Sequence, residues 1–270
     1  SIPAAENVSA GYAAGSNGLE EVFTAAMRTS LTPASAASSL GGASTTAVLG
    51  TARIGDPELT GAEFWELLRS SKAGLAGLLQ LRGGLIRVSD ILPKEVAEET
   101  LKKLESLERS EWLESNSALY DDKGSYGDTT AKHWFFRYDG DKLDGTFREL
   151  HALAPDLFPS FQAAKYEKSG NLSAHDDSNY FQITSTDKNR SPRYPAGTLM
   201  FRKIAVIFYL TKDWRQEYGG SLMDLHDQEP KFLVPRFNSL VAFLVPRVHQ
   251  VEELADGCPP RFTLFGWFSE

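Results

Sequence analysis

The second half of the chain is a succession of short strand-like segments, and this pattern constrains the fold more than any other feature. Between residues 161 and 268, eight segments rich in β-branched and aromatic residues are separated by Gly, Pro, Asn and Asp. Many short strands with turn residues between them are typical of a sandwich or a barrel. We therefore predict a β core over residues 161–270.

Residues 58–160 have a different pattern, in which helical spacing predominates. Apolar residues recur at helical intervals in three stretches, which predicts one or two helices over 58–82, one over 93–115 and one over 145–158. Two strands are expected in the same region, at 84–92 and 133–139. We expect this part to be mostly helical and to support the β core.

Residues 1–57 form a third region, an N-terminal extension rich in Ala, Ser and Gly. Within it, residues 18–31 could form a short amphipathic helix, and the rest has the composition of a loop or linker. The stretch from Met27 to Leu40 is rich in Ser and Ala and contains no acidic residue, so a remnant of a transit peptide is a further interpretation.

The overall charge restricts the class of partner. The chain of 270 residues has a formal net charge of −8 and a pI near 5.3, which argues against nucleic acid as a partner. No apolar run approaches the roughly 20 residues needed to span a bilayer, so no membrane partner is expected. The single Cys258 excludes an intrachain disulfide. We predict a cytoplasmic protein, or an organellar one if the extension is a targeting remnant.

The candidate metal site begins with His175 and Asp177. Two residues apart at the end of a strand, their side chains lie on one face, because the side-chain period of a strand is 2. A third ligand must come from a distant segment, and His249 is the best candidate. Two His and one carboxylate form the facial triad of non-haem Fe(II) oxygenases, which leaves coordination positions open.

Two residues compete with these ligands. Asp176 is the rival carboxylate, but it alternates to the opposite side of the strand from His175, so we expect it outside the ligand set. His226 is the rival imidazole, and we expect it to have a surface or pocket role.

A candidate anion site follows in residues 261–268, which read as a strand. Arg261 and Thr263 project to one face of this strand, and a guanidinium with a hydroxyl is suited to hold a carboxylate. Together with the metal triad, this pair points to an oxygenase that uses 2-oxoglutarate.

These segments resemble a known family. Residues 209–227 and 235–268, with the motif around His249 and the Arg at 261, resemble the prolyl-hydroxylase branch of the Fe(II)/2-oxoglutarate dioxygenases, and in particular the hypoxia-sensor and ribosomal-protein prolyl hydroxylases. The resemblance covers roughly residues 85–270. It implies a double-stranded β-helix, or jelly roll, with flanking helices, so that 58–270 would be one dioxygenase domain.

The resemblance also implies the chemistry. Fe(II), 2-oxoglutarate and O2 would be required, with ascorbate as a further candidate, and 2-oxoglutarate would be decarboxylated to succinate and CO2. Tyr166 matches the tyrosine that contacts the cosubstrate in the family, and Arg261 and Thr263 would hold the far carboxylate. Arg202, before the long apolar strand, is a less specific candidate with a structural alternative.

One segment departs from the family pattern. Residues 179–201 form a longer connection after the His-x-Asp motif than the family has, and they hold Lys188, Arg190 and Arg193 in an acidic chain. We expect residues 184–197 to cover the mouth of the metal site and to favour substrates that carry carboxylates. The alternative is a solvated surface insertion.

Three functions are therefore compared. The first is hydroxylation of a prolyl residue in a peptide or protein. The second is the same oxidative chemistry on a free amino acid or specialised metabolite, with cyclisation or desaturation as other outcomes. The third is a binding module that keeps the fold without catalysis, and the intact ligand set and Arg261 argue against it.

Overall fold

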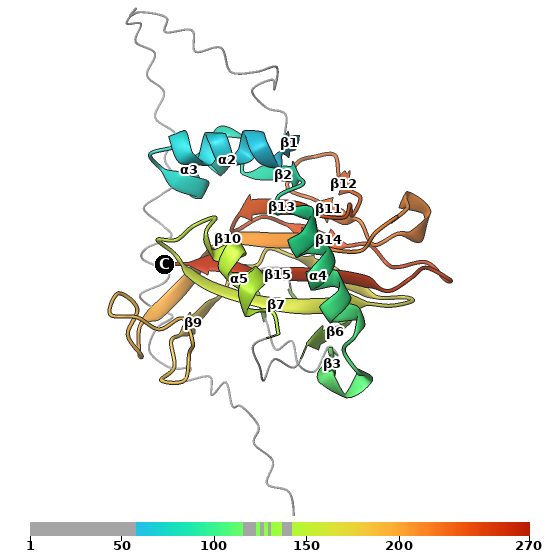
Figure 1. Ribbon diagram of the computed structural model, residues 1–270. Coiled ribbons are helices and arrows are strands. Elements are labelled where there is room, and N and C mark those ends of the chain that lie inside the picture. Colours follow the sequence, from blue (N-terminus) through green and yellow to red (C-terminus); the bar gives the residue numbers. More distant parts are fainter. Residues whose placement is uncertain (1–57, 116–122, 125–126, 129–130, 137–141) are drawn as a thin grey trace, which may run out of the picture. The chain divides into compact units, whose positions relative to one another are not determined.

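The computed structural model describes residues 58–115, 123–124, 127–128, 131–136 and 142–270 (Figure 1). The N-terminal extension, with its expected helix over 18–31 and its possible targeting remnant, lies outside the described residues. None of the described helices is long and apolar enough to cross a membrane.

Strands are the most numerous elements of the described chain. They are β1 (Glu58–Thr60), β2 (Leu85–Ser89), β3 (Trp112–Ser115), β4 (Lys123–Gly124), β5 (Gly127–Asp128), β6 (Ala131–Phe136), β7 (Phe158–Tyr166), β8 (Asn171–His175), β9 (Tyr180–Gln182), β10 (Leu199–Tyr209), β11 (Leu222–Asp224), β12 (Lys231–Leu233), β13 (Ser239–Leu244), β14 (His249–Val251) and β15 (Arg261–Ser269). Strands β4 and β5 pair only with each other, and the others belong to one large sheet.

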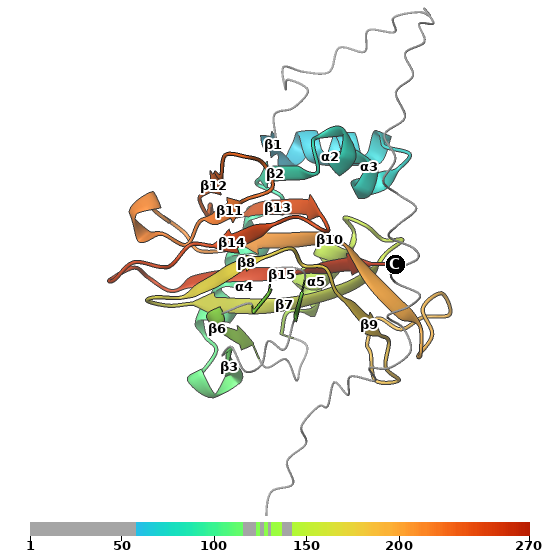
Figure 2. The same ribbon diagram turned by 180° about the vertical axis from the view of Figure 1, so that it is seen from behind.

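The large sheet curls into two layers. Its order is β1-β2-β13-β10-β15-β7-β6-β8-β14-β11-β12, with β3 added to β6 and β9 added to β10. Strand β6 pairs with both β7 and β8, so it turns the corner between the layer around β10 and β15 and the layer around β8 and β14 (Figure 2). Only β1 and β2 are parallel among these pairs. The predicted jelly-roll core with flanking helices is confirmed.

In the part of the chain that the structure describes, four α-helices flank the sheet. They are α2 (Gly61–Ser70), α3 (Gly74–Leu81), α4 (Lys94–Glu105) and α5 (Asp144–His151). Helices α4 and α5 lie on the face of the β7–β15–β10 layer that is turned away from β8 and β14 (Figures 1 and 2). Helix α2 begins with a capping box, in which the Thr60 side chain and Glu63 satisfy each other's backbone N–H groups.

Alternation along β10 divides the core into two parts. Ile204, Val206 and Phe208 pack with the helices, whereas Ala205 and Tyr209 face the space between the two strand layers. Successive side chains of a strand point to opposite faces, so one apolar strand supplies both cores. The inner core, between the layers, is where the metal and anion candidates are found.

The expected helix over 93–115 is too long. Helix α4 ends at Glu105, and Trp112 begins strand β3, which pairs with β6. Trp112 is buried, with its ring 6.0 Å from that of Phe136 and 6.1 Å from that of Phe262. Burial of a large aromatic side chain against the sheet outweighs the weak local preference for helix. Residues 58–160 thus contribute strands as well as the expected helices.

Candidate metal and cosubstrate site

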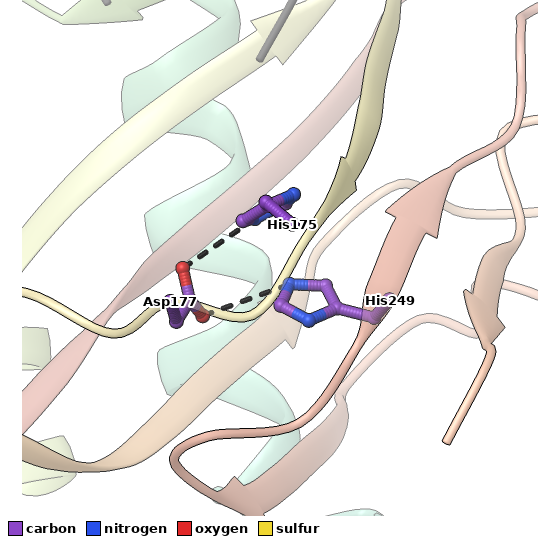
Figure 3. A group of neighbouring side chains, drawn as sticks. All are labelled: His175, Asp177 and His249. Carbon is purple, nitrogen blue, oxygen red and sulfur yellow. Dashed lines mark ion pairs between the residues drawn. The ribbon is translucent and has the colours of Figure 1, made fainter. Parts of the chain in front are cut away.

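Strands β8 and β14 bring the three candidate metal ligands together. His175 ends β8 and His249 begins β14, and the two residues are direct partners in the antiparallel pairing of these strands. Asp177 follows two residues after His175, in a left-handed backbone conformation with φ of 63°. Asp tolerates this conformation better than most residues, and here it turns the carboxylate toward both imidazoles (Figure 3).

The geometry of the group is that of a small chelate. The Nε2 atom of His175 lies 3.4 Å from one carboxylate oxygen of Asp177, and the Nε2 atom of His249 lies 3.6 Å from the other. One ligand atom from each residue lies within 4.8 Å of the others. Among the described residues, this is the single group of His, Cys, Asp and Glu that could hold a metal ion.

Backbone carbonyls orient both imidazoles. The Nδ1 atom of His175 lies 2.8 Å from the carbonyl oxygen of Ser173, and the Nδ1 atom of His249 lies 2.7 Å from that of Arg247. A carbonyl can only accept, so each Nδ1 carries the proton, and each Nε2 presents its lone pair to the centre of the group. Hydrogen bonds of this kind fix the tautomer and the ring orientation of metal-bound histidines.

The three residues also shift one another's pKa. Burial raises the pKa of Asp177, but the charges of the two imidazoles outweigh it and hold that pKa well below its usual range. Burial lowers the pKa of His249 to about 4. For His175, burial acts in the same direction, but the hydrogen bond and charge of Asp177 outweigh it and raise the pKa. The carboxylate is therefore ionised, as a metal ligand must be.

The two rivals lie outside this group. The carboxylate of Asp176 accepts a hydrogen bond from the Ser178 backbone N–H at 2.9 Å, which closes the turn after β8. His226 follows β11, and its backbone N–H donates to Asp224 at 3.2 Å. Neither side chain belongs to the group of close ligand atoms.

A second charged position lies in the inner core at Arg261. Its side chain is 2% exposed, and its guanidinium carbon lies 4.1 Å from the ring centre of Tyr166 and 5.8 Å from that of Tyr209. It donates to the carbonyl of Gly220, whose φ of 66° suits a glycine. No described carboxylate lies within salt-bridge distance of Arg261, and its Nε has no hydrogen-bond partner among the described residues.

A buried guanidinium without an anion is energetically unfavourable, so this position suits a ligand that brings a carboxylate. Thr263 shares the inner face of β15 with Arg261, as the alternation predicts, because Phe262 and Leu264 pack with the helices instead. Burial raises the pKa of Tyr166 to about 12, so its phenol keeps its proton and can donate it in a hydrogen bond.

Two residues of this pocket were missed by the sequence analysis. Tyr209 is fully buried beside Arg261, and the pairing of β10 with β15 sets it opposite Thr263. His133 on β6 stacks on Tyr166 with the ring centres 4.8 Å apart, and burial lowers its pKa to about 3. Alternation along each strand could have suggested that these side chains point inward, but only the pairing of strands shows which inward side chains meet.

The cations of the 179–201 insertion are exposed, in contrast to the buried Arg261. Strand β9 pairs with the start of β10, and the loop between them holds Lys188, Arg190 and Arg193 in exposed positions. Arg193 makes a salt bridge of 3.0 Å to Asp156, at the loop before β7. Arg202, by contrast, stacks on Trp267 at 3.5 Å and donates to the carbonyl oxygen of Asp177 at 3.5 Å.

Comparison with known proteins agrees with this geometry. The model of the 2OG-Fe(II) oxygenase superfamily matches residues 161–269, which include the three candidate ligands and Arg261. Residues 161–269 are thus similar to the 2OG-Fe(II) oxygenase superfamily. The superfamily is named for Fe(II) and 2-oxoglutarate, and the matched residues contain a group of two imidazoles and one carboxylate that could hold a metal ion.

The chain is also similar to a prolyl hydroxylase of known name. Prolyl 3-hydroxylase OGFOD1 of Mus musculus is 34% identical over 125 residues, in a match that covers 42% of this chain. The match spans 19% of that relative's length.

Two solved structures are similar as well. A Pseudomonas putida prolyl-4-hydroxylase has a TM-score of 0.48 at 17% identity, covering 72% of this chain and 97% of that one. A Trichoplax adhaerens prolyl hydroxylase in complex with a hypoxia-inducible-factor peptide has a TM-score of 0.49 at 15% identity, covering 76% of this chain and 92% of that one.

Proposed function

We propose that the protein is an Fe(II)/2-oxoglutarate-dependent dioxygenase that hydroxylates a prolyl residue in a peptide or protein. The observation that carries the proposal is the pairing, in one inner core, of a three-ligand group with a buried guanidinium that has no described anion beside it. A metal site alone fits many proteins. The lone Arg261 is accounted for by a cosubstrate that supplies a carboxylate.

The residues of the chain have separate tasks in this proposal. His175, Asp177 and His249 hold Fe(II) from one side, with the two Nε2 atoms aimed by the backbone carbonyls. Arg261 pairs with the far carboxylate of 2-oxoglutarate, and Thr263, Tyr166 and Tyr209 donate hydrogen bonds around it. When bound, Fe(II), 2-oxoglutarate and O2 together supply the oxidising chemistry, in which the cosubstrate becomes succinate and CO2.

The protein's remaining contribution is to exclude water and fix orientations. The guanidinium of Arg261 lies beside the rings of Tyr166 and Tyr209, both nearly inaccessible to solvent. In such a dry pocket, an ion pair is stronger than in water. No general acid or base is assigned, because the chain's own groups only bind and position the reactants.

The prolyl substrate is proposed from the resemblance and from the name of the murine relative, a prolyl 3-hydroxylase. The alternative is the same oxidation of a free amino acid or specialised metabolite. The exposed cations Lys188 and Arg190 in the 179–201 insertion favour a substrate with carboxylates, whether peptide or small molecule. Location in the cytoplasm stays a prediction.

Two assays test the proposal. Succinate formation from 2-oxoglutarate with Fe(II) and O2, compared with the His175→Ala variant, separates an oxygenase from a binding module. Mass spectrometry for a product 16 Da heavier, across a panel of proline-containing peptides and a metabolite pool, separates the two substrate classes. The alternative would replace the prolyl proposal if the protein forms succinate, hydroxylates no peptide of the panel, and gives an oxidised product in the metabolite pool.

A further inference from the structure

Arg247 lies just before strand β14 and is almost entirely buried, at 5% exposure. Three guanidinium nitrogens are engaged. Nε and Nη2 donate to the two carboxylate oxygens of Asp224 at 2.9 and 2.7 Å, and Nη1 donates to the carbonyl of Gly83 at 3.1 Å. Asp224 is 1% exposed, so the pair is a desolvated, two-pronged ion pair inside the protein.

The backbone of Arg247 touches both segments that carry the candidate ligands. Its carbonyl oxygen lies 2.7 Å from Nδ1 of His249 and accepts that proton. Its N–H donates to the carbonyl of Asp176 at 3.2 Å, in the turn that presents Asp177. On the other side, Asp224 is the direct strand partner of His249 in the pairing of β11 with β14.

We propose that Arg247 is a positioning residue for the metal site. Its pair with Asp224 holds the backbone at position 247, and that backbone in turn sets the ring of His249 and the turn that carries Asp177. The inference rests on the proposed function, because it takes the three-ligand group to bind Fe(II). Arg suits the task better than Lys, since its planar fork engages both carboxylate oxygens and fixes an orientation as well as a distance.

The energetics of buried ion pairs support a positioning role. Taking both charges out of water opposes their attraction, so replacing such a pair by neutral groups of similar size is often harmless to stability. Removing one partner alone strands a buried charge and destabilises the fold. A neutral double variant therefore separates stability from orientation, which a single substitution cannot do.

The experiment compares four forms of the full chain: wild type, Arg247→Met with Asp224→Asn, Arg247→Lys, and Leu101→Ala. Leu101 is buried on α4 in the core between helices and sheet, away from the inner core, and serves as a control for lost stability. Fe(II) and Co(II) are titrated without oxygen, cosubstrate or substrate. The visible absorption of bound Co(II) reports the geometry of the ligands, and thermal melting of the metal-free protein reports stability.

We expect the double variant to bind Fe(II) about 10- to 100-fold more weakly, as for the loss of other groups that orient metal-bound histidines. Its Co(II) spectrum should change, while its melting temperature stays near that of the wild type. The Fe(II) affinity of Arg247→Lys should lie between that of the wild type and that of the double variant. Leu101→Ala should melt earlier with unchanged affinity and spectrum.

Two results would overturn the inference while leaving the proposed function standing. One is a double variant whose affinity and spectrum equal those of a wild type that binds metal and forms succinate. The other is a Leu101→Ala variant that loses as much affinity as the double variant, which would make Arg247 merely structural. A wild type that binds neither Fe(II) nor Co(II) would overturn the proposed function, and this inference with it.

Discussion

The three-ligand group and Arg261 both lie in the inner core, but only the first has its charged side chain partnered by other side chains of the protein. Asp177 lies between two imidazoles, and the charge of Arg202 also helps to lower the pKa of its carboxylate, so this ionised group has favourable partners within the protein. Arg261 has aromatic rings and the Gly220 carbonyl around it, and no described carboxylate beside it. The first site is thus organised before any ligand arrives, whereas the second is electrostatically incomplete and depends on its ligand for the missing charge.

The largest expected effect tests the three-ligand group. Asp177→Ala should abolish detectable metal binding and turnover, because only two imidazoles remain. Asp176→Ala is the matched control one residue away, and it should retain both, since its carboxylate only closes the turn to Ser178. Anaerobic Fe(II) titration and succinate assays measure the two variants. An active Asp177→Ala protein beside an inactive Asp176→Ala protein would mean that the wrong carboxylate has been assigned.

The next largest effect tests the role of Arg261. Arg261→Ala should raise the 2-oxoglutarate requirement by about 2–4 kcal/mol, on the order of 30- to 1,000-fold, because a buried charge-assisted contact is lost. Fe(II) affinity should change little.

Lys203→Ala provides the control for Arg261→Ala, since Lys203 is a half-exposed cation of β10 paired with Glu270 at 2.8 Å. Titration of 2-oxoglutarate against both variants shows whether Arg261 or Lys203 anchors the cosubstrate. Unchanged cosubstrate affinity in Arg261→Ala, with a loss in Lys203→Ala, would transfer the anchoring role.

The thermal stability of Arg261→Met, compared with that of the wild type, also tests whether Arg261 depends on a ligand for its missing charge. Arg261→Met removes a buried cation that lacks a described anion, so the melting temperature of the ligand-free protein should stay level or rise. Added 2-oxoglutarate with a redox-inert metal such as Mn(II) should raise the melting temperature of the wild type and not that of Arg261→Met. A marked loss of ligand-free stability in Arg261→Met would show that the pocket is complete without its ligand.

A smaller effect is expected at Tyr209. If its hydroxyl donates to the cosubstrate carboxylate, Tyr209→Phe should weaken 2-oxoglutarate binding by about 1.5 kcal/mol, roughly tenfold, with the ring packing preserved. Tyr166→Phe is the natural companion, because both rings flank Arg261. Equal cosubstrate affinities for wild type and Tyr209→Phe would limit Tyr209 to packing.

The smallest effect is expected in the 179–201 insertion. The triple change Lys188→Ala, Arg190→Ala and Arg193→Ala removes exposed charges, each worth well under about 1 kcal/mol, so kcat/KM for the prime substrate should fall only about two- to tenfold. Succinate formation without substrate should stay intact. Arg193→Ala alone is the control, because its salt bridge to Asp156 is accounted for within the fold. Identical kinetics in the triple variant would make the insertion a surface feature only.

The sequence alone determined the faces of single strands. The spacing of Arg261 and Thr263 placed both residues on one side of their strand, because alternation along a strand is a local property. For His175 and Asp177 the spacing suggested the pair, but a left-handed residue after the end of β8 brings the carboxylate to the imidazoles. The succession of short strand-like segments with turn residues between them predicted the β core. The resemblance to the family then linked these local patterns to Fe(II) and 2-oxoglutarate.

Only the tertiary structure decided which faces meet. The pairing of His175 with His249, the position of Tyr209 beside Arg261, and the contacts of Arg247 with Asp224 and Gly83 all join residues far apart in the chain. The early end of helix α4 at Glu105 has the same origin, because Trp112 is buried against the sheet. Local spacing sets where a side chain points, but long-range strand pairing and burial determine what it touches.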